Sequence, residues 1–188
     1  QALIEHGDLI QSYFMKEEPK LGSDKFYRLN QARQKEGYFV YIPEGLSIPK
    51  PIEVFNWISG KDSAIFPYNL IVSGKGSEVS VAEYVASADD QFGLVCGVSD
   101  LIAEDDSKLT YVRTQNLSEK AHSIQLSNVL SHNNSKVKNF SLNLGCEWLR
   151  HESVSRLLGK GANSEMISVS VPESSQEFDM RTLQLHEK

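Results

Sequence analysis

The sequence predicts a mainly β protein whose core is a right-handed parallel β-helix with about 29 residues in each repeat. A serine followed by a charged residue and a large apolar residue recurs at intervals of 28 to 30 residues, at Ser77, Ser107, Ser135 and Ser164. A polar or glycine-rich turn precedes each serine, and an apolar stretch precedes each turn. Self-similarity at a fixed period of about 20 to 50 residues indicates stacked repeats, because one unit cannot bury its apolar face alone.

Other repeat folds fit this pattern less well. A propeller blade needs about 40 residues and carries a Trp-Asp mark, and the left-handed β-helix needs a hexapeptide repeat. The sequence has neither feature. A repeat of the length seen here provides two or three strands with their turns. That length suits one coil of a parallel β-helix, although a hairpin unit of a sandwich would have the same length.

Residues 1–36 are predicted to form a short helical segment that precedes the β-helix. A first amphipathic helix is expected to end before Pro19, because proline cannot continue a helix. A second helix is expected from an N-cap at Ser23 or Asp24 as far as Gly37. The apolar residues that share one face of the first helix are Leu3, Ile4, Ile10, Tyr13 and Phe14.

Helical periodicity ends there, and residues 37–188 are predicted to form the β-helix. Residues 38–42 are aromatic or β-branched and stop at Pro43, which is typical of a strand. Residues 79–81 and 168–171 alternate strictly between valine and serine, as half-buried strands do. The coarse organisation is therefore a helical segment followed by a long all-β run.

Composition argues against several functional classes. The 188 residues carry a net charge of −6 without a dense basic run, so no nucleic-acid partner is expected. No apolar stretch approaches the roughly 20 residues that span a bilayer, so no membrane insertion is expected. The first residues do not resemble a signal peptide, and we expect a cytoplasmic protein.

The two cysteines, Cys96 and Cys146, do not form a C-x-x-C pair. Each stands among apolar neighbours on an expected strand, which favours small, buried and inert side chains. The alternative, a redox or cluster-binding thiol, requires exposure and a lowered pKa.

His122, His151 and Met180 follow one another at the same interval, which equals the repeat period. In a regular solenoid these three side chains would stack about 4.8 Å apart. Such a ladder could be a metal or proton site, or a half-buried row that serves packing. Two histidines without a third ligand in phase make a poor metal cage, so no metal site is assigned.

An enzyme is not expected. The acidic pairs Asp89-Asp90 and Asp105-Asp106 fall in predicted turns rather than on a sheet face. The Gly-Lys pairs at residues 74–75 and 159–160 lack the glycine that a phosphate-binding loop has five residues earlier. No catalytic, cofactor-binding or metal-ligating residue is therefore assigned. A β-helix carbohydrate-active enzyme and a structural or adhesive β-solenoid remain the alternative functions.

Several segments resemble the SufB/SufD family of iron–sulfur cluster assembly proteins. Residues 38–45 and 48–52 resemble the family's opening segment, residues 69–81 its first repeat, and residues 109–116 its central segment. The likeness runs through nearly the whole chain in the family's order. The polar pattern of a later segment is matched by Gln176, Asp179, Arg181, Thr182 and His186.

The resemblance implies a non-catalytic β-helix scaffold that works in a complex. Its expected partners are a SufB-like paralogue and a SufC-like ATPase, which the family binds through a C-terminal helical region. Ser155 stands where SufB has a cysteine, which favours a SufD-like protein, and Met180 stands where many SufD-like members have a histidine. The whole complex would handle the iron–sulfur cluster, and no cofactor is expected on this segment.

Members of the family are usually much longer than 188 residues. The resemblance therefore implies that the chain is an N-terminal half, with the SufC-binding helices and any cluster ligands beyond it, or else that the protein is a shortened relative. An open β-helix exposes the strand edges of its last coil. We accordingly expect self-association through residues 166–185.

Overall fold

The protein is described by a computed structural model that covers residues 2–60 and 62–187. Three short helices come first, α1 (Ala2–Glu5), α2 (Gly7–Tyr13) and α3 (Asp24–Arg33), and twelve strands follow. The strands are β1 (Gly37–Ile42), β2 (Ile52–Ile58), β3 (Ser63–Ile65), β4 (Tyr68–Ser73), β5 (Glu78–Ser87), β6 (Gly93–Ala103), β7 (Lys108–Asn116), β8 (Ala121–Ser131), β9 (Lys136–Asn143), β10 (Trp148–Leu157), β11 (Asn163–Ser170) and β12 (Glu177–His186).

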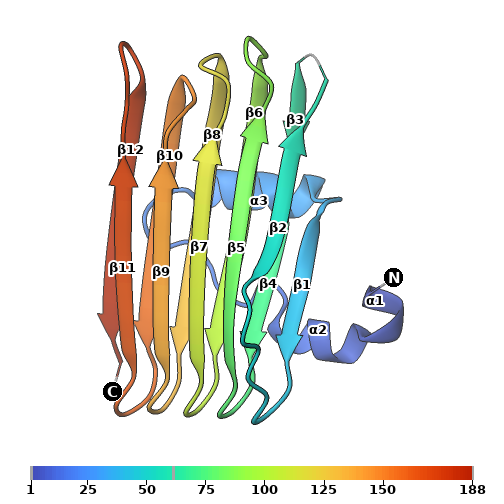
Figure 1. Ribbon diagram of the computed structural model, residues 1–188, viewed down its shortest axis with the longest axis vertical. Helices are drawn as coiled ribbons and strands as arrows, with labels where there is room; N and C mark the ends of the chain where they lie inside the picture. The colour runs from blue at the N-terminus through green and yellow to red at the C-terminus, as the bar shows by residue number, and fades with distance from the viewer. Residues whose placement is uncertain (1, 61, 188) are drawn as a thin grey trace.

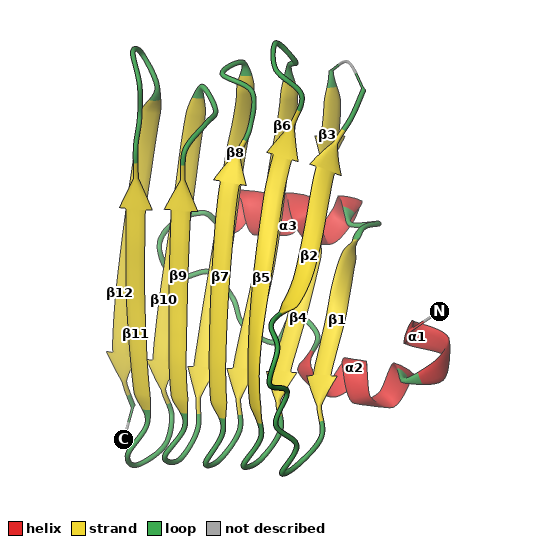
Figure 2. Cartoon of the chain, viewed as in Figure 1, coloured by secondary structure: helices red, strands yellow, loops and turns green. Residues whose placement is uncertain are grey.

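The strands form two parallel sheets. Sheet A has the order β1-β4-β6-β8-β10-β12, with β3 also pairing with β6, and sheet B has the order β11-β9-β7-β5-β2. The chain rises through a strand of sheet B, turns, descends through a strand of sheet A and then begins the next coil (Figure 1). This right-handed winding confirms the predicted β-helix, and Figure 2 shows that the region after α3 consists of strands joined by turns and loops.

A ladder of left-handed turn residues joins sheet A to sheet B at one end of each coil. Gly76, Asp106, Asn134 and Gly161 have φ values of 63°, 61°, 54° and 71°. Glycine, asparagine and aspartate tolerate this conformation better than other residues do. The backbone N–H of Asp106 donates to Asn133 O at 2.8 Å, and that of Asn134 donates to Lys160 O at 2.9 Å. The turns therefore stack in register with the strands.

The serine that follows each turn has a local role in the first three repeats. Ser77, Ser107 and Ser135 occupy equivalent positions, since Glu78 pairs with Lys108 and Lys108 with Lys136. Ser107 Oγ, for example, donates to Glu104 O at 2.7 Å and so closes its turn. The expected fourth member was wrong. Lys136 pairs with Asn163, which puts Ala162 at the serine position and Ser164 two residues later, beside Val137.

Helices α2 and α3 pack on the outer face of sheet A, where α3 crosses it, whereas α1 lies past the edge of the sheet (Figure 2). Asn30, fully buried on α3, donates from Nδ2 to Pro67 O at 2.9 Å and to Cys96 O at 2.7 Å. The first helix ends at Tyr13, well before Pro19, and it is split into α1 and α2. None of the described helices is long and apolar enough to cross a membrane. The apolar cluster between helices and sheet includes Ile10, Tyr27, Leu70, Val98, Ile124 and Leu126.

Candidate functional site

A layer of buried polar side chains lies between the two sheets. Alternation along the strands directs every second side chain inward. On β7 the burial alternates in this way, and the buried members at its centre are Tyr111, Arg113 and Gln115. The layer comprises nine buried residues, Asn69, Glu83, Ser99, Tyr111, Arg113, Gln115, Gln125, Asn143 and His151.

Glu83 on β5 is the acidic centre of this layer. Its Oε1 accepts hydrogen bonds from Asn56 Nδ2 at 2.6 Å and from Asn69 Nδ2 at 3.0 Å. Its Oε2 accepts a hydrogen bond from Tyr111. Burial, with Glu83 as a second cause, raises the pKa of Tyr111 well above its usual range, so this phenol stays protonated. The residues come from three strands of sheet B and one of sheet A, so only the coiled fold brings them together.

Arg113 on β7 is the basic centre and lies beside Glu83. The guanidinium Nε is 3.9 Å from Glu83 Oε2, and both side chains are at most 2% exposed. None of its three nitrogens has a hydrogen-bond acceptor among the described residues. A guanidinium has five N–H donors, so this burial leaves a large unmet capacity for hydrogen bonding.

His151 faces the same layer, but not beside His122. Its neighbours on the ladder are Gln125 on β8 and Met180 on β12. Burial, and then the charge of Arg113, lowers the pKa of His151 to about 3, so the imidazole is neutral at pH 7. Neither ring nitrogen has a partner among the described residues.

Of the predicted ladder of His122, His151 and Met180, the pairing of His122 with His151 was wrong. The pairing of His151 with Met180 is present. His122 lies opposite Trp148, because the coil from β8 to β10 is shorter at this level than the repeat period. The side chain of His122 is about half exposed and its Nε2 lies 3.4 Å from Glu147 Oε2. The shorter coil moves the histidine out of phase with His151 and onto the outer face.

Both cysteines are buried, as predicted, and they lie on different sides of sheet A. Cys96 faces outward under α3, where its Sγ donates to Phe26 O at 3.4 Å. Cys146 lies between β9 and β10 in the interior, with φ 107°. Burial raises the pKa of each thiol to about 12. Since the thiolate is the reactive form, both thiols are poor nucleophiles and metal ligands at neutral pH.

The other residues singled out in the sequence do not gather at a site. Asp105 and Asp106 lie in a turn, where their Oδ1 atoms accept hydrogen bonds from Asn133 and Asn134 at about 3.0 Å. Asp90 forms an exposed ion pair with Lys120. The Gly-Lys segments lie in turns, as expected. Within residues 2–60 and 62–187, no group of three or more His, Cys, Asp or Glu side chains could hold a metal ion.

The polar layer is almost closed to solvent. A cavity of about 30 Å³ adjoins His151 and is lined by Asn139, Ser153 and Met180 among others. That volume holds one water molecule, for which about 10 to 15 Å³ is the minimum. Within the described residues, the layer therefore holds a charge pair and a neutral imidazole inside the solenoid, with room for one water molecule beside His151.

Sequence reasoning missed Glu83 and Arg113 as interior residues. The signal was the alternation in residues 109–115, where the inward positions of an apolar strand continue as Tyr, Arg and Gln. Ser155, singled out only through the family resemblance, does face the interior from β10 and is fully buried.

Comparison with known proteins places this architecture among relatives. A family model described as "SUF system FeS cluster assembly, SufBD core domain" matches residues 56–188. The chain is 30% identical over 118 residues to the "Iron-sulfur cluster assembly protein SufD" of Bacillus subtilis, covering 62% of this chain and 27% of that protein. It is 25% identical over 186 residues to an "Iron-sulfur cluster assembly SufBD family protein" of Staphylococcus epidermidis, covering 98% and 40% of the two chains. A protein of the same description in Staphylococcus haemolyticus matches with the same identity and coverage. The chain thus spans well under half the length of these curated relatives.

Proposed function

Because the chain belongs to the SufBD core domain family of the SUF system, we propose that it is a SufD-like, non-catalytic scaffold for iron–sulfur cluster assembly. The observation that carries the proposal is the family match over residues 56–188, which coincides with the stacked coils. The relatives named for cluster assembly extend it to nearly the whole chain.

The chemistry of the interior supports a scaffold. Both thiols have raised pKa values, Ser155 stands where the family resemblance implies a cysteine in SufB, and the cavity beside the polar layer has a volume of only about 30 Å³. The acidic pairs expected of a carbohydrate-active β-helix are engaged in surface turns instead.

We propose that the scaffold works in the cytoplasm, with a SufB-like paralogue and a SufC-like ATPase. The cluster is then cargo of the assembled complex rather than a resident cofactor of this chain. The family resemblance implies that SufC binds a C-terminal helical region, and this chain covers only 27% and 40% of the two relatives' length.

A chimera tests the proposal directly. The matching region of Bacillus subtilis SufD is replaced by residues 56–188 of this chain, and the chimera is expressed in cells depleted of their own SufD. We expect restored growth, restored activity of iron–sulfur enzymes, and co-purification with SufB and SufC. A folded chimera that joins the complex without restoring cluster supply would contradict the scaffold role, and one that does not join the complex would contradict the assigned partners.

A further inference from the structure

The first strand of sheet A leaves one edge unpaired. Among the described strands, β1 pairs only with β4. Tyr68 N donates to Glu36 O at 3.1 Å and Gly74 N donates to Ile42 O at 2.9 Å, so even-numbered residues direct their backbone groups toward β4. Backbone direction alternates along a strand. The N–H and C=O groups of Gly37, Phe39 and Tyr41 therefore point to the free edge.

The sequence of β1 lacks the residues that usually discourage strand pairing. Natural edge strands carry charges, prolines or bulges that discourage another strand from adding to them. The sequence of β1 is Gly-Tyr-Phe-Val-Tyr-Ile and contains none of these residues. At the opposite edge of sheet A, β12 carries Asp179 and Arg181, whose charged groups are 3.0 Å apart. The two ends of the sheet are thus protected differently.

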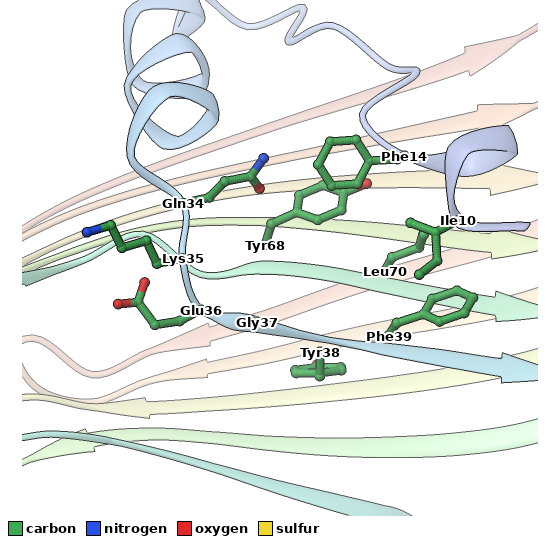
Figure 3. Close-up of a pocket in the computed structure, with 10 residues that line it drawn as sticks. All are labelled: Ile10, Phe14, Gln34, Lys35, Glu36, Gly37, Tyr38, Phe39, Tyr68 and Leu70. Carbon is green, nitrogen blue, oxygen red and sulfur yellow. The ribbon is translucent and has the colours of Figure 1, made fainter. Parts of the chain in front are cut away.

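A groove runs beside β1 on the face that the helices cover. It has a volume of about 470 Å³ and lies between α2 and the connection from α3 to β1. Figure 3 shows Ile10, Phe14, Phe39 and Leu70 along one part of it and the polar residues Gln34 to Glu36 along another. A strand added at the free edge would place its side chains next to Phe39, on the groove side.

We propose that the edge of β1 and this groove form a docking site for an extended segment of another protein. The segment would add a strand to sheet A and place apolar side chains in the groove. Backbone hydrogen bonds supply affinity in this mode of recognition, and pockets for alternate side chains supply specificity.

The surroundings of the edge favour a single strand over a second copy of this chain. Helices α1 and α2 extend past β1 on the side of its free edge (Figure 1). An added strand needs only about 4.8 Å of space beside β1, whereas a second solenoid that approached the same edge would meet these helices.

The test uses a fluorescent eight-residue peptide of alternating valine and threonine, N-methylated along one edge so that it pairs along the other edge only. Binding to the 188-residue chain is measured by fluorescence anisotropy. Tyr41→Pro removes an outward N–H that β4 does not use, and proline is tolerated on such an edge. Tyr41→Thr is the matched control, because it removes the ring and keeps the N–H.

We expect saturable binding by the parent chain and by Tyr41→Thr, and at least a tenfold loss of affinity in Tyr41→Pro. Equal binding by both variants, or no binding by the parent chain, would overturn the proposal. If sedimentation shows a dimer that Tyr41→Pro abolishes, the edge serves a second copy and the proposed partner is wrong. If Tyr41→Pro does not fold, Phe39→Lys replaces it, with Phe39→Leu as its control, and the same loss is expected.

Discussion

At the scale of single residues, the interior ion pair of Glu83 and Arg113 is the most costly feature of the fold. Removing two charges from water carries a penalty of several kcal/mol per ion, and mutual attraction offsets it only when hydrogen bonds complete the pair. Glu83 has three such bonds, from Asn56, Asn69 and Tyr111. Arg113 has no side-chain hydrogen bond within the described residues.

Replacing Arg113 with methionine should therefore destabilise the protein. It leaves the Glu83 carboxylate buried without a compensating charge, a change that costs about 3 to 5 kcal/mol. The double variant Glu83→Gln/Arg113→Met should recover most of that loss, because neither charge remains. The free energy of unfolding, measured with urea in all four proteins of the cycle, checks both statements. If Arg113→Met alone is as stable as the parent chain, the charges of Glu83 and Arg113 are not coupled in the folded state.

Asp100, on the outer face of sheet A, makes stability depend on pH. Burial raises its pKa from 3.8 to about 6, although Tyr68 and Asn128 donate hydrogen bonds to it and oppose that shift. Glu17 adds a smaller upward effect. A carboxyl whose pKa is higher in the folded state favours folding below its unfolded pKa and loses that advantage as pH rises.

Over its whole titration this group should lower the free energy of unfolding by about 3 kcal/mol, at 1.36 kcal/mol per pKa unit, and about 2 kcal/mol of that falls between pH 4 and pH 6. Asp100→Asn has no carboxyl to titrate here and should not lose this stability. The free energy of unfolding of the variant, relative to that of the parent chain, should therefore rise from pH 4 to pH 6. Urea unfolding at closely spaced pH values measures it. His151 has a lowered pKa and acts in the opposite sense, but it is present in both proteins and cancels from the difference. A constant difference from pH 4 to pH 7 would contradict the assignment.

At the scale of elements, the left-handed turns hold the coils in register. Asn134 lies between Asp106 and Gly161 in the turn ladder, with φ 54°. Its side chain donates to Asp106 Oδ1 at 3.0 Å, which links two successive coils. The backbone conformation and this side-chain bond make separate contributions to stability.

Two substitutions separate these contributions. Asn134→Gly keeps access to the left-handed conformation and loses only an exposed hydrogen bond, so it should cost about 1 kcal/mol or less. Asn134→Ala also incurs the left-handed penalty of about 1 to 2 kcal/mol and should be the less stable of the two. Thermal unfolding of both variants against the parent chain provides the comparison. If alanine is as stable as glycine at this position, the turn is not under the conformational restraint described.

The same turns explain what could be predicted from sequence. Their residue types are fixed by backbone conformation, so the serine repeat was visible and indicated the period and the parallel β-helix. In the fourth repeat the turn is followed by Ala162 instead of a serine. The sequence motif therefore assigned this position wrongly to Ser164. The number of residues between paired positions in sheet A is not fixed in this way. It is smaller from His122 to its partner Trp148 than from Tyr68 to its partner Val98. The histidine ladder failed for this reason.

The polar layer was harder to predict because its side chains come from four different coils. A shift of one residue moves a side chain from the inner to the outer face of a strand. The sequence alone is therefore equally consistent with Arg113 as an exposed cation on the outer face. Its interior position follows only when Leu109 and Tyr111 are assigned to the core side. Contacts such as Asn69 with Glu83 then depend on the register of both sheets.

At the scale of the whole molecule, the coils stack in one dimension, and each contacts only its neighbours. Stability in such proteins is approximately a sum of coil and interface contributions, and terminal coils have one interface fewer. The burial pattern agrees: β6 and β8 are buried along most of their length, whereas β11 and β12 are exposed or half-buried throughout. The helical segment adds a second layer on the outer face of sheet A, with apolar contacts from β1 to β10.

Hydrogen exchange should therefore be slowest at the centre of the stack. The strands β6, β7 and β8 each pair with another strand on both sides. Their amides should therefore exchange only when a large part of the solenoid unfolds. Amides of β11 and β12 should exchange faster by tenfold or more, because the terminal coil can open without disturbing the rest. Mass-spectrometric exchange at pH 7, corrected with rates from the unfolded chain, measures this gradient. Equal protection in β8 and β12 would mean that the coils open as one unit, and the one-dimensional description of this solenoid would then be wrong.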